Sequence, residues 1–213
     1  MSISTNQSAS KIEREIKFLQ LLQRDLEITL KGEEIINNTL KLKKGNTEGQ
    51  AAFKKARSGE PEHVRKVYKF LPREISISSE WEEKHIWIPV ACLFVFYPQK
   101  IEEVKDSKRH NFARSCWDLA VEINKTGESK GTERRFRALL DTSLADICSP
   151  LTNLVRQMKS KGVDINYPQL LADLQQWDHP NQYIQDRWAR TFWRAPSTGD
   201  LIDPITEPAN SDN

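Results

Sequence analysis

Guanidinium groups at helical spacing are the side chains of this 213-residue chain best suited to binding chemistry. The stretch 131–140 reads GTERRFRALL, and its apolar residues repeat at helical steps along one side. Arg134 and Arg137 point roughly the opposite way, and Arg135 lies on the flank. Arginine forks of this kind suit bidentate binding of phosphate. The alternative is an ordinary solvated face on which Arg137 pairs with Asp141 at i,i+4.

A second arginine stripe is expected in a helix from about residue 181 to residue 194. Its apolar side is formed by Ile184, Trp188 and Phe192. Four other residues cluster within about 60° of arc, namely Tyr183, Arg187, Arg190 and Arg194. Only Asp186 lies close enough in the helix to offset them. The stripe suits phosphates with a base or sugar stacked nearby, or alternatively acids of another subunit.

A third group of bases lies in the first half, where residues 49–57 read GQAAFKKAR. Its small apolar face permits close helix packing, and Lys54, Lys55 and Arg57 project from the remainder. Seven bases face two acids between residues 49 and 73. Nucleic-acid contact and a solvated charged face are both compatible with this segment.

Catalytic and metal-binding patterns are missing from the sequence. The four histidines have no metal-ligand spacing, and the motifs HExxH, GxGxxG, GxxxxGKS/T and GxSxG do not occur. Asp164, Asp173 and Asp178 could be imagined as a metal cluster, but no partner falls at a ligand-like spacing. We therefore predict a protein that is not an enzyme, with no cofactor and no metal.

Charge is abundant, at 29%, but nearly balanced, at a formal +2. The tail from residue 195 carries four acids and no base, so the rest of the chain carries +6. A basic body with an acidic tail is compatible with a polyanionic partner. Cys92, Cys116 and Cys148 are odd in number and widely spaced, which favours reduced thiols in a cytoplasmic protein. The most apolar run, 86–97, is too short to span a membrane.

Helical periodicity recurs along the chain and strand alternation does not, so the prediction is an all-α fold. The breaker-rich segment 125–131 suggests a boundary between two small helical bundles packed in one elongated chain. The predicted divisions are an N-terminal bundle at 1–126, a C-terminal bundle at 127–195 and a disordered acidic tail at 196–213.

Several helix ends can be predicted from capping residues. Ser10 and Glu13 fit a capping box for a first helix that Gly32 would end, and a weaker helix is expected over 35–42. Further helix starts are indicated by capping residues or proline, at Ser79, Thr132, Ser149 and Pro168. The apolar helix after Ser79 is expected to be central to the first bundle and to bend or restart at Pro89.

Four blocks together resemble the CasB family, the small subunit of the type I-E CRISPR surveillance complex, Cascade. Residues 132–140 resemble the family's ERRFRRLL block, and 165–177 (INYPQLLADLQQW) resemble IDWPQLLxDLxxW. Residues 188–193 (WARTFW) resemble WAxxFW, and 49–57 resemble GxxAxLRRA. The chain departs from these patterns where Phe-Lys-Lys replaces Leu-Arg-Arg at 53–55 and Asn-Tyr replaces Asp-Trp at 166–167. The segment before residue 49 and the acidic tail are long for the family.

The resemblance implies a non-catalytic protein of two helical bundles that works inside Cascade. It implies that two copies pack along the inner side of the complex, against the crRNA-holding backbone subunits and the large subunit. It also implies that a basic surface holds the opened target DNA, especially the displaced non-target strand, and so stabilises the R-loop. The residues assigned to that surface are Lys54, Lys55, Arg57, Arg134, Arg135, Arg137, Arg187, Arg190 and Arg194.

Two other hypotheses remain at this stage. In the first, the protein is purely a structural adaptor, and the same bases bind acidic patches on sister subunits. In the second, it is a stand-alone helical enzyme. The sequence does not decide which bases face DNA and which face protein.

Overall fold

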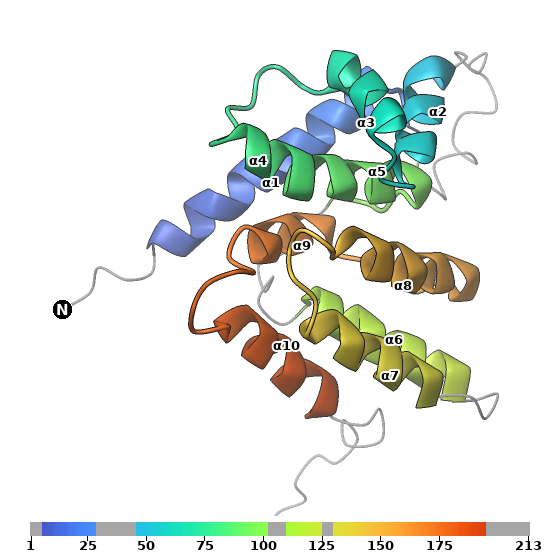
Figure 1. Ribbon diagram of the computed structural model, residues 1–213, viewed down its shortest axis with the longest axis vertical. Helices are drawn as coiled ribbons and strands as arrows, with labels where there is room; N and C mark the ends of the chain where they lie inside the picture. The colour runs from blue at the N-terminus through green and yellow to red at the C-terminus, as the bar shows by residue number, and fades with distance from the viewer. Residues whose placement is uncertain (1–5, 29–45, 102–109, 125–129, 195–213) are drawn as a thin grey trace, which may run out of the picture.

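The computed structural model describes residues 6–28, 46–101, 110–124 and 130–194, and the side chains from residue 12 onward. Helices form the regular structure of this part of the chain, with no strand within it, which confirms the all-α prediction (Figure 1). The weak helix predicted over 35–42 and the predicted tail at 196–213 lie outside the described residues.

The helices form two groups that lie one above the other in Figure 1. The N-terminal group contains α1 (Asn6–Asp25), α2 (Thr47–Ala56), α3 (Pro61–Val67), α4 (Glu80–Glu82) and α5 (Ile88–Phe96). The C-terminal group contains α6 (Phe112–Asn124), α7 (Lys130–Leu140), α8 (Cys148–Lys161), α9 (Tyr167–Leu174) and α10 (Tyr183–Trp193). Both groups contribute to one continuous apolar core.

Side chains cap four of the described helices, and one of the caps is Asn111, which accepts from the Arg114 N–H of α6 at 3.2 Å. The Asn46 carboxamide accepts from the Gly49 N–H of α2 (2.9 Å), and the Ser79 hydroxyl accepts from the Glu82 N–H of α4 (3.1 Å). Asn166 does the same at the start of α9. Each cap satisfies an N–H that has no partner inside the helix. The start predicted at Ser79 is confirmed, and that at Pro168 is displaced by one residue.

Other helix ends differ from the predictions. α1 starts at Asn6, before Ser10, and ends at Asp25, well before Gly32. The turn after α1 places Glu27 at a left-handed φ of 49°, which stops the helix. α7 starts at Lys130, so Thr132 is a buried residue inside the helix and not its cap. α8 likewise starts at Cys148, one residue before the predicted cap.

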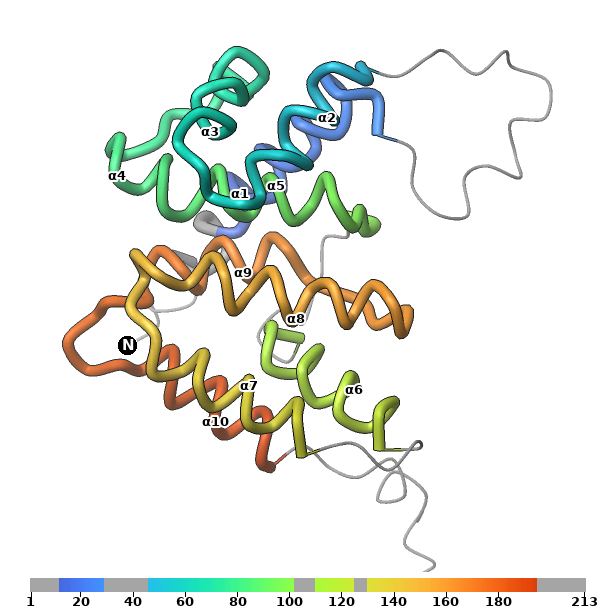
Figure 2. The backbone as a smooth tube through the Cα atoms, turned by 45° about the vertical axis from the view of Figure 1, so that its right-hand side comes forward, coloured from blue at the N-terminus to red at the C-terminus, as the bar shows by residue number. Residues whose placement is uncertain are grey.

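The apolar helix after Ser79 has two parts joined by a π-helical turn over Glu83–Trp87. Pro89 is the second residue of α5, directly after the π-helical turn, and it lacks the N–H that would bond back into that turn. The helical geometry therefore changes beside the proline, but the chain stays helical from Glu80 to Phe96, and the predicted bend or restart stays a prediction. α5 is buried almost all round and lies between α2 and α8 in both views (Figures 1 and 2).

The two groups meet where α9 packs against α1 and α5. The Tyr167 ring packs edge-on against Phe94, and its hydroxyl is within donating distance of the Leu93 and Tyr97 carbonyl oxygens (3.1 and 3.0 Å). α6 packs on α7, α8 and α10, and so belongs with the C-terminal group. The predicted domain boundary between 126 and 127 stays a prediction, and this packing favours a position before α6.

Candidate nucleic-acid interface

The arginines of α7 lie on its solvent side. Phe136 and Leu139 are fully buried, whereas Arg134, Arg135 and Arg137 are exposed, as their spacing predicts. The Arg137 guanidinium donates to Glu133 Oε1 at 3.0 Å. The partner in the chain is therefore the acid one turn before Arg137 and not Asp141, which was the alternative that the sequence offered.

An exposed tryptophan at the end of α10 borders these arginines. The Trp193 side chain is 45% exposed, and its indole N–H donates to Glu133 Oε1 at 3.3 Å. The Arg137 guanidinium carbon lies 5.9 Å from the Trp193 ring centroid, and Phe136 packs against the same ring. Sequence reasoning treated Trp193 only as part of a family block. Its exposure could have been noticed because it falls outside the apolar stripe of α10.

Arg190 and Arg194 are exposed near the same end of α10. The Arg190 guanidinium lies 3.9 Å from an Asp186 oxygen, and both side chains are about two-thirds exposed. An exposed pair at this distance contributes little to stability. Arg134, Arg135, Arg137, Arg190 and Arg194, together with Trp193, are called the α7–α10 face below.

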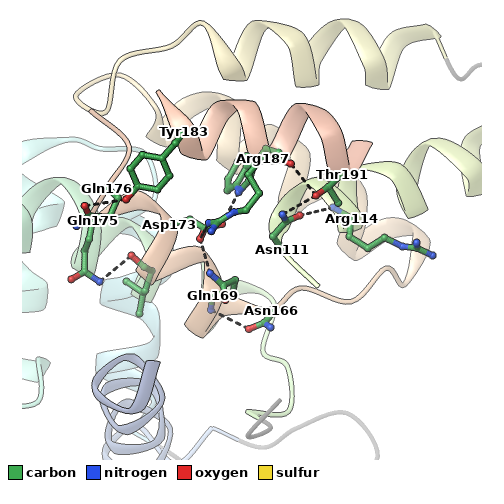
Figure 3. Close-up of polar contacts among 12 residues, drawn as sticks. Asn111, Arg114, Asn166, Gln169, Asp173, Gln175, Gln176, Tyr183, Arg187 and Thr191 are labelled. Atoms are coloured by element: carbon green, nitrogen blue, oxygen red, sulfur yellow. Dashed lines mark hydrogen bonds and ion pairs between the residues drawn. The ribbon is translucent and has the colours of Figure 1, made fainter. Parts of the chain in front are cut away.

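Arg187 does not lie free beside Arg190 and Arg194. Its guanidinium bonds the Asp173 carboxylate on α9, which is buried to 99% (Figure 3). Asp173 also accepts from the Trp188 indole N–H and the Gln169 amide N–H, each at 2.6 Å. The sequence-based assignment of Arg187 to an outward stripe is corrected here, because its charge is neutralised inside the chain.

Burial raises the pKa of Asp173, and the nearby charge of Arg187 acts in the opposite direction. The carboxylate thus ties α9 to α10 through the ion pair with Arg187 and the hydrogen bond from Trp188, and the Gln169 bond lies within α9. From the sequence, Asp173 was only a weak candidate for a metal ligand. In the structure it fixes the position of α10, the helix that carries Arg190 and leads to Arg194. The sequence signal that could have revealed it is an acid placed among Leu170, Leu171 and Leu174 on an apolar helix.

The bases of α2 lie in the other helix group, apart from the α7–α10 face (Figure 1). Lys54 and Lys55 are exposed, as predicted. Arg57 is half-buried, and its guanidinium carbon lies 3.6 Å from the centre of the Phe96 ring, at the end of α5. The predicted bases therefore form two separate sets, one on each helix group.

The described residues show no sign of a metal site or a membrane span. Within the described residues, no group of three or more His, Cys, Asp or Glu side chains is placed to hold a metal ion. None of the helices in this part of the chain is long and apolar enough to cross a membrane. His85 bonds the Trp81 carbonyl oxygen from its own helix, in keeping with a structural histidine.

Comparison with known proteins decides the family. The sequence model of the family "CRISPR-associated protein Cse2" matches residues 49–193, about two-thirds of the chain. The chain belongs to the Cse2 family. The matched range runs from Gly49 in α2 to Trp193 at the end of α10, and so includes the bases of both sets except Arg194.

Individual Cse2 proteins are similar to this chain. A CRISPR-associated protein Cse2 from Thermus thermophilus is 26% identical over 151 residues, which is 70% of this chain and 80% of that protein. A crystal structure of a Cse2-family protein from the same organism matches with a TM-score of 0.61 and 24% identity, covering 86% of this chain and 98% of the other.

The crystal structure of M. ruber CasB matches with a TM-score of 0.64 and 22% identity, covering 91% of this chain and 99% of the other. Solved structures under both names, Cse2 and CasB, therefore share this fold, and the CasB resemblance is confirmed. The Cse2 family is a family of Cascade subunits, so this chain is placed among the subunits of that complex.

Proposed function

We propose that the protein is the non-catalytic small subunit of a type I-E Cascade. In this role it contacts the backbone of the target DNA, especially the displaced non-target strand, and stabilises the R-loop during antiviral defence. Its partners would be the backbone and large subunits and a second copy of itself. The observation that carries the proposal is a set of exposed bases without a carboxylate partner in the described part of the chain: Lys54, Lys55, Arg134, Arg135 and Arg194.

Position distinguishes this set, because its members gather on α2 and on the α7–α10 face, whereas Lys17, Arg65 and Lys84 are also exposed and unpaired in the described residues but lie elsewhere. Lys66 pairs with Glu62 and Lys69 with Glu48, so acids lie beside some of the exposed bases. A base left without an acid keeps its charge available to a phosphate. Such contacts carry no sequence information, which suits a subunit that must accept any target.

The energetics of R-loop formation favour a role of this kind. Exchange of a DNA duplex for an RNA–DNA heteroduplex is nearly balanced, so modest contacts to a separated strand shift the equilibrium. Trp193 adds an aromatic surface beside Arg137, and stacking of a base on an aromatic ring is worth about 1–3 kcal/mol. Because only unpaired bases can stack in this way, the α7–α10 face is suited to single-stranded DNA.

The contact set that we propose is the sequence-based set without Arg187. Arg187 is left out because its guanidinium forms an ion pair with Asp173. Arg137 and Arg190 stay in the set because their acids, Glu133 and Asp186, are substantially exposed and can exchange for phosphate.

The test is the salt dependence of single-stranded DNA binding by a triple variant, Arg134→Ala, Arg135→Ala and Arg194→Ala. Each lost phosphate contact should reduce the slope of log K against log salt by up to about 0.7. The matched control removes three exposed bases elsewhere, Lys17, Arg65 and Lys84, and should keep the wild-type slope. An unchanged slope in the first variant would rule out these arginines as DNA contacts.

The alternative is a structural adaptor whose bases bind acidic patches on sister subunits. The pairs Arg137–Glu133 and Arg190–Asp186 favour it, because in both of them an arginine of the α7–α10 face is paired with a carboxylate. The same triple variant separates the two functions. If the arginines contact DNA, the variant enters the complex but the complex binds target DNA more weakly. If they contact sister subunits, the variant does not assemble into the complex.

A further inference from the structure

Two cations from different helix groups share one aromatic ring. The Lys159 ammonium of α8 lies 4.2 Å from the centre of the Phe96 ring, the same ring that Arg57 of α2 covers at 3.6 Å. Lys159 also donates to the Phe96 carbonyl oxygen at 2.8 Å. Because α5 lies between α2 and α8, its last residue brings together bases that are far apart in the sequence (Figures 1 and 2).

Two more bases, Arg156 and Lys54, are close enough to shift the pKa values of Arg57 and Lys159. The pKa of Arg57 is lowered, first by burial and then by the charge of Arg156. The pKa of Lys159 is lowered by burial, then by Lys54 and Arg57. No carboxylate contributes to either shift. Lys54, Arg57, Arg156 and Lys159 therefore form a group of like charges around Phe96, called the Phe96 cluster below.

The Phe96 cluster also contains an unused hydrogen-bond donor. Arg57 Nη1 is buried and has no hydrogen-bond partner, although a buried guanidinium N–H without an acceptor is unfavourable. Within the described residues, no ion pair gives the Phe96 cluster a counter-charge and no acceptor reaches Arg57 Nη1, while the Phe96 carbonyl oxygen accepts from Lys159. A compact oxyanion would supply both at once, with the geometry that arginine and lysine bind well.

We propose that Lys54, Arg57, Arg156 and Lys159 form a binding site for one oxyanion of the phosphate class, and that its binding locks the N-terminal helix group to the C-terminal group. The anion can come from solution as inorganic phosphate or from a nucleic-acid backbone as a phosphodiester. Without it, repulsion between α2 and α8 loosens their contact across α5. The site shares Lys54 and Arg57 with the proposed DNA-contact set, but it does not depend on the proposed function, since a free anion would have the same effect.

The experiment compares thermal unfolding of the full chain in sodium phosphate and in sodium chloride at equal ionic strength and pH 7. A ligand that binds only the folded state raises the melting temperature in a saturable way. At ten times its dissociation constant, phosphate should raise the melting temperature by about 3–6 °C for a chain of this size. Equal melting temperatures in the two salts would overturn the proposal.

The decisive variant is Lys54→Met with Arg156→Met, because both side chains are exposed and their loss leaves the packing on Phe96 in place. It should melt higher than wild type in chloride, since repulsion is relieved, and lose at least half of the response to phosphate. The matched control, Lys17→Met with Lys84→Met, removes the same charge from exposed positions on other elements and should respond like wild type. An equal phosphate response in the two variants would contradict the site.

A second arm distinguishes the two sources of the anion. A short oligothymidylate is titrated into wild type and into the Lys54→Met, Arg156→Met variant. Weaker binding to the variant, together with competition by phosphate, assigns the site to a nucleic-acid phosphodiester. Equal binding, with the phosphate response lost in the variant, assigns it to free phosphate and leaves the proposed function to be tested on the α7–α10 face alone.

Discussion

The surroundings of Asp173 and those of Phe96 each contain a partly buried arginine, but they differ in the charge that the arginine meets. At Asp173, one buried carboxylate receives Arg187, the Trp188 indole and the Gln169 amide, so each charge has a partner. At Phe96, Arg57 and Lys159 meet over a ring with only its π face and one carbonyl oxygen as acceptors. In the first arrangement the arginine meets a carboxylate of the chain, although Arg187 Nε has no hydrogen-bond partner. In the second, no carboxylate of the described residues pairs with the cations, and an anion from outside is the partner that we propose.

The difference shows that the position of an arginine on a helix does not reveal how its charge is used. Arg187 and Arg57 both belong to basic stripes, and both are partly buried. What separates them is the residue that a second helix brings to them, a carboxylate from α9 in one case and further cations from α8 in the other. Stability should therefore depend on the first arginine, and ligand binding on the second.

The largest effect is expected from Asp173→Ala. Loss of this carboxylate leaves the buried Trp188 indole N–H and the partly exposed Arg187 guanidinium without their acceptor. A buried donor left without its acceptor costs about 1–3 kcal/mol, and more where the donor is charged, which urea denaturation can measure. The control is Asp186→Ala, which removes an exposed acid of α10 and should cost less than about 1 kcal/mol. Equal losses in the two variants would show that Asp173 is no more important than a surface acid.

Much of the fold could be predicted because its signals are local. Apolar spacing places the stripes of α6, α9 and α10, and the Ser79 hydroxyl caps its helix as its residue type suggests. Predicted ends failed where the deciding feature is not local. Glu27 adopts a left-handed φ that its residue type does not favour, and Thr132 is buried in a helix that starts earlier.

A second prediction separates stability from binding. Arg187→Met should lower the free energy of unfolding by about 1–3 kcal/mol, because Asp173 loses a charged donor, but should leave the salt slope of DNA binding unchanged. Arg194→Met should leave the free energy of unfolding unchanged and reduce the salt slope of DNA binding. Both are followed by urea denaturation and by DNA titration over a range of salt. A reduced salt slope for the Arg187 variant would show that Arg187 contacts DNA and belongs in the contact set.

The candidate site could be predicted only as a set of charges. The sequence places Lys54, Lys55, Arg134 and Arg135 at the surface correctly, since helical spacing determines their side. It cannot show that Asp173 reaches Arg187 from α9, because that contact depends on how two helices pack. Arg156 and Lys159 were missed for the same reason. In sequence they are ordinary bases of α8, and only packing through α5 brings them to Arg57.

A third prediction concerns pH. The folded-state pKa of Asp173 lies above its ordinary value of 3.8 because the carboxyl is buried. The folded protein then binds this proton more tightly than the unfolded chain, so the stability from this group is largest below pH 3.8 and falls as the pH rises through the folded-state pKa. Wild-type stability minus that of Asp173→Asn should fall by about 1.4 kcal/mol for each pH unit between the two pKa values and be constant above them. A difference that grows with pH would mean that Arg187 outweighs burial.

The smallest effect is expected from Glu133→Gln, which tests whether the α7–α10 face can be made to resemble the Phe96 cluster. The carboxylate of Glu133 is the acceptor for both Arg137 and the Trp193 indole. Its replacement should cost less than about 1 kcal/mol of stability, because the pair is exposed. It should strengthen single-stranded DNA binding by about two- to five-fold, since phosphate no longer competes with the carboxylate for Arg137. Weaker binding would instead mean that Glu133 is needed to hold Arg137 and Trp193 in place, so that this face too would be a structure organised by its own acid.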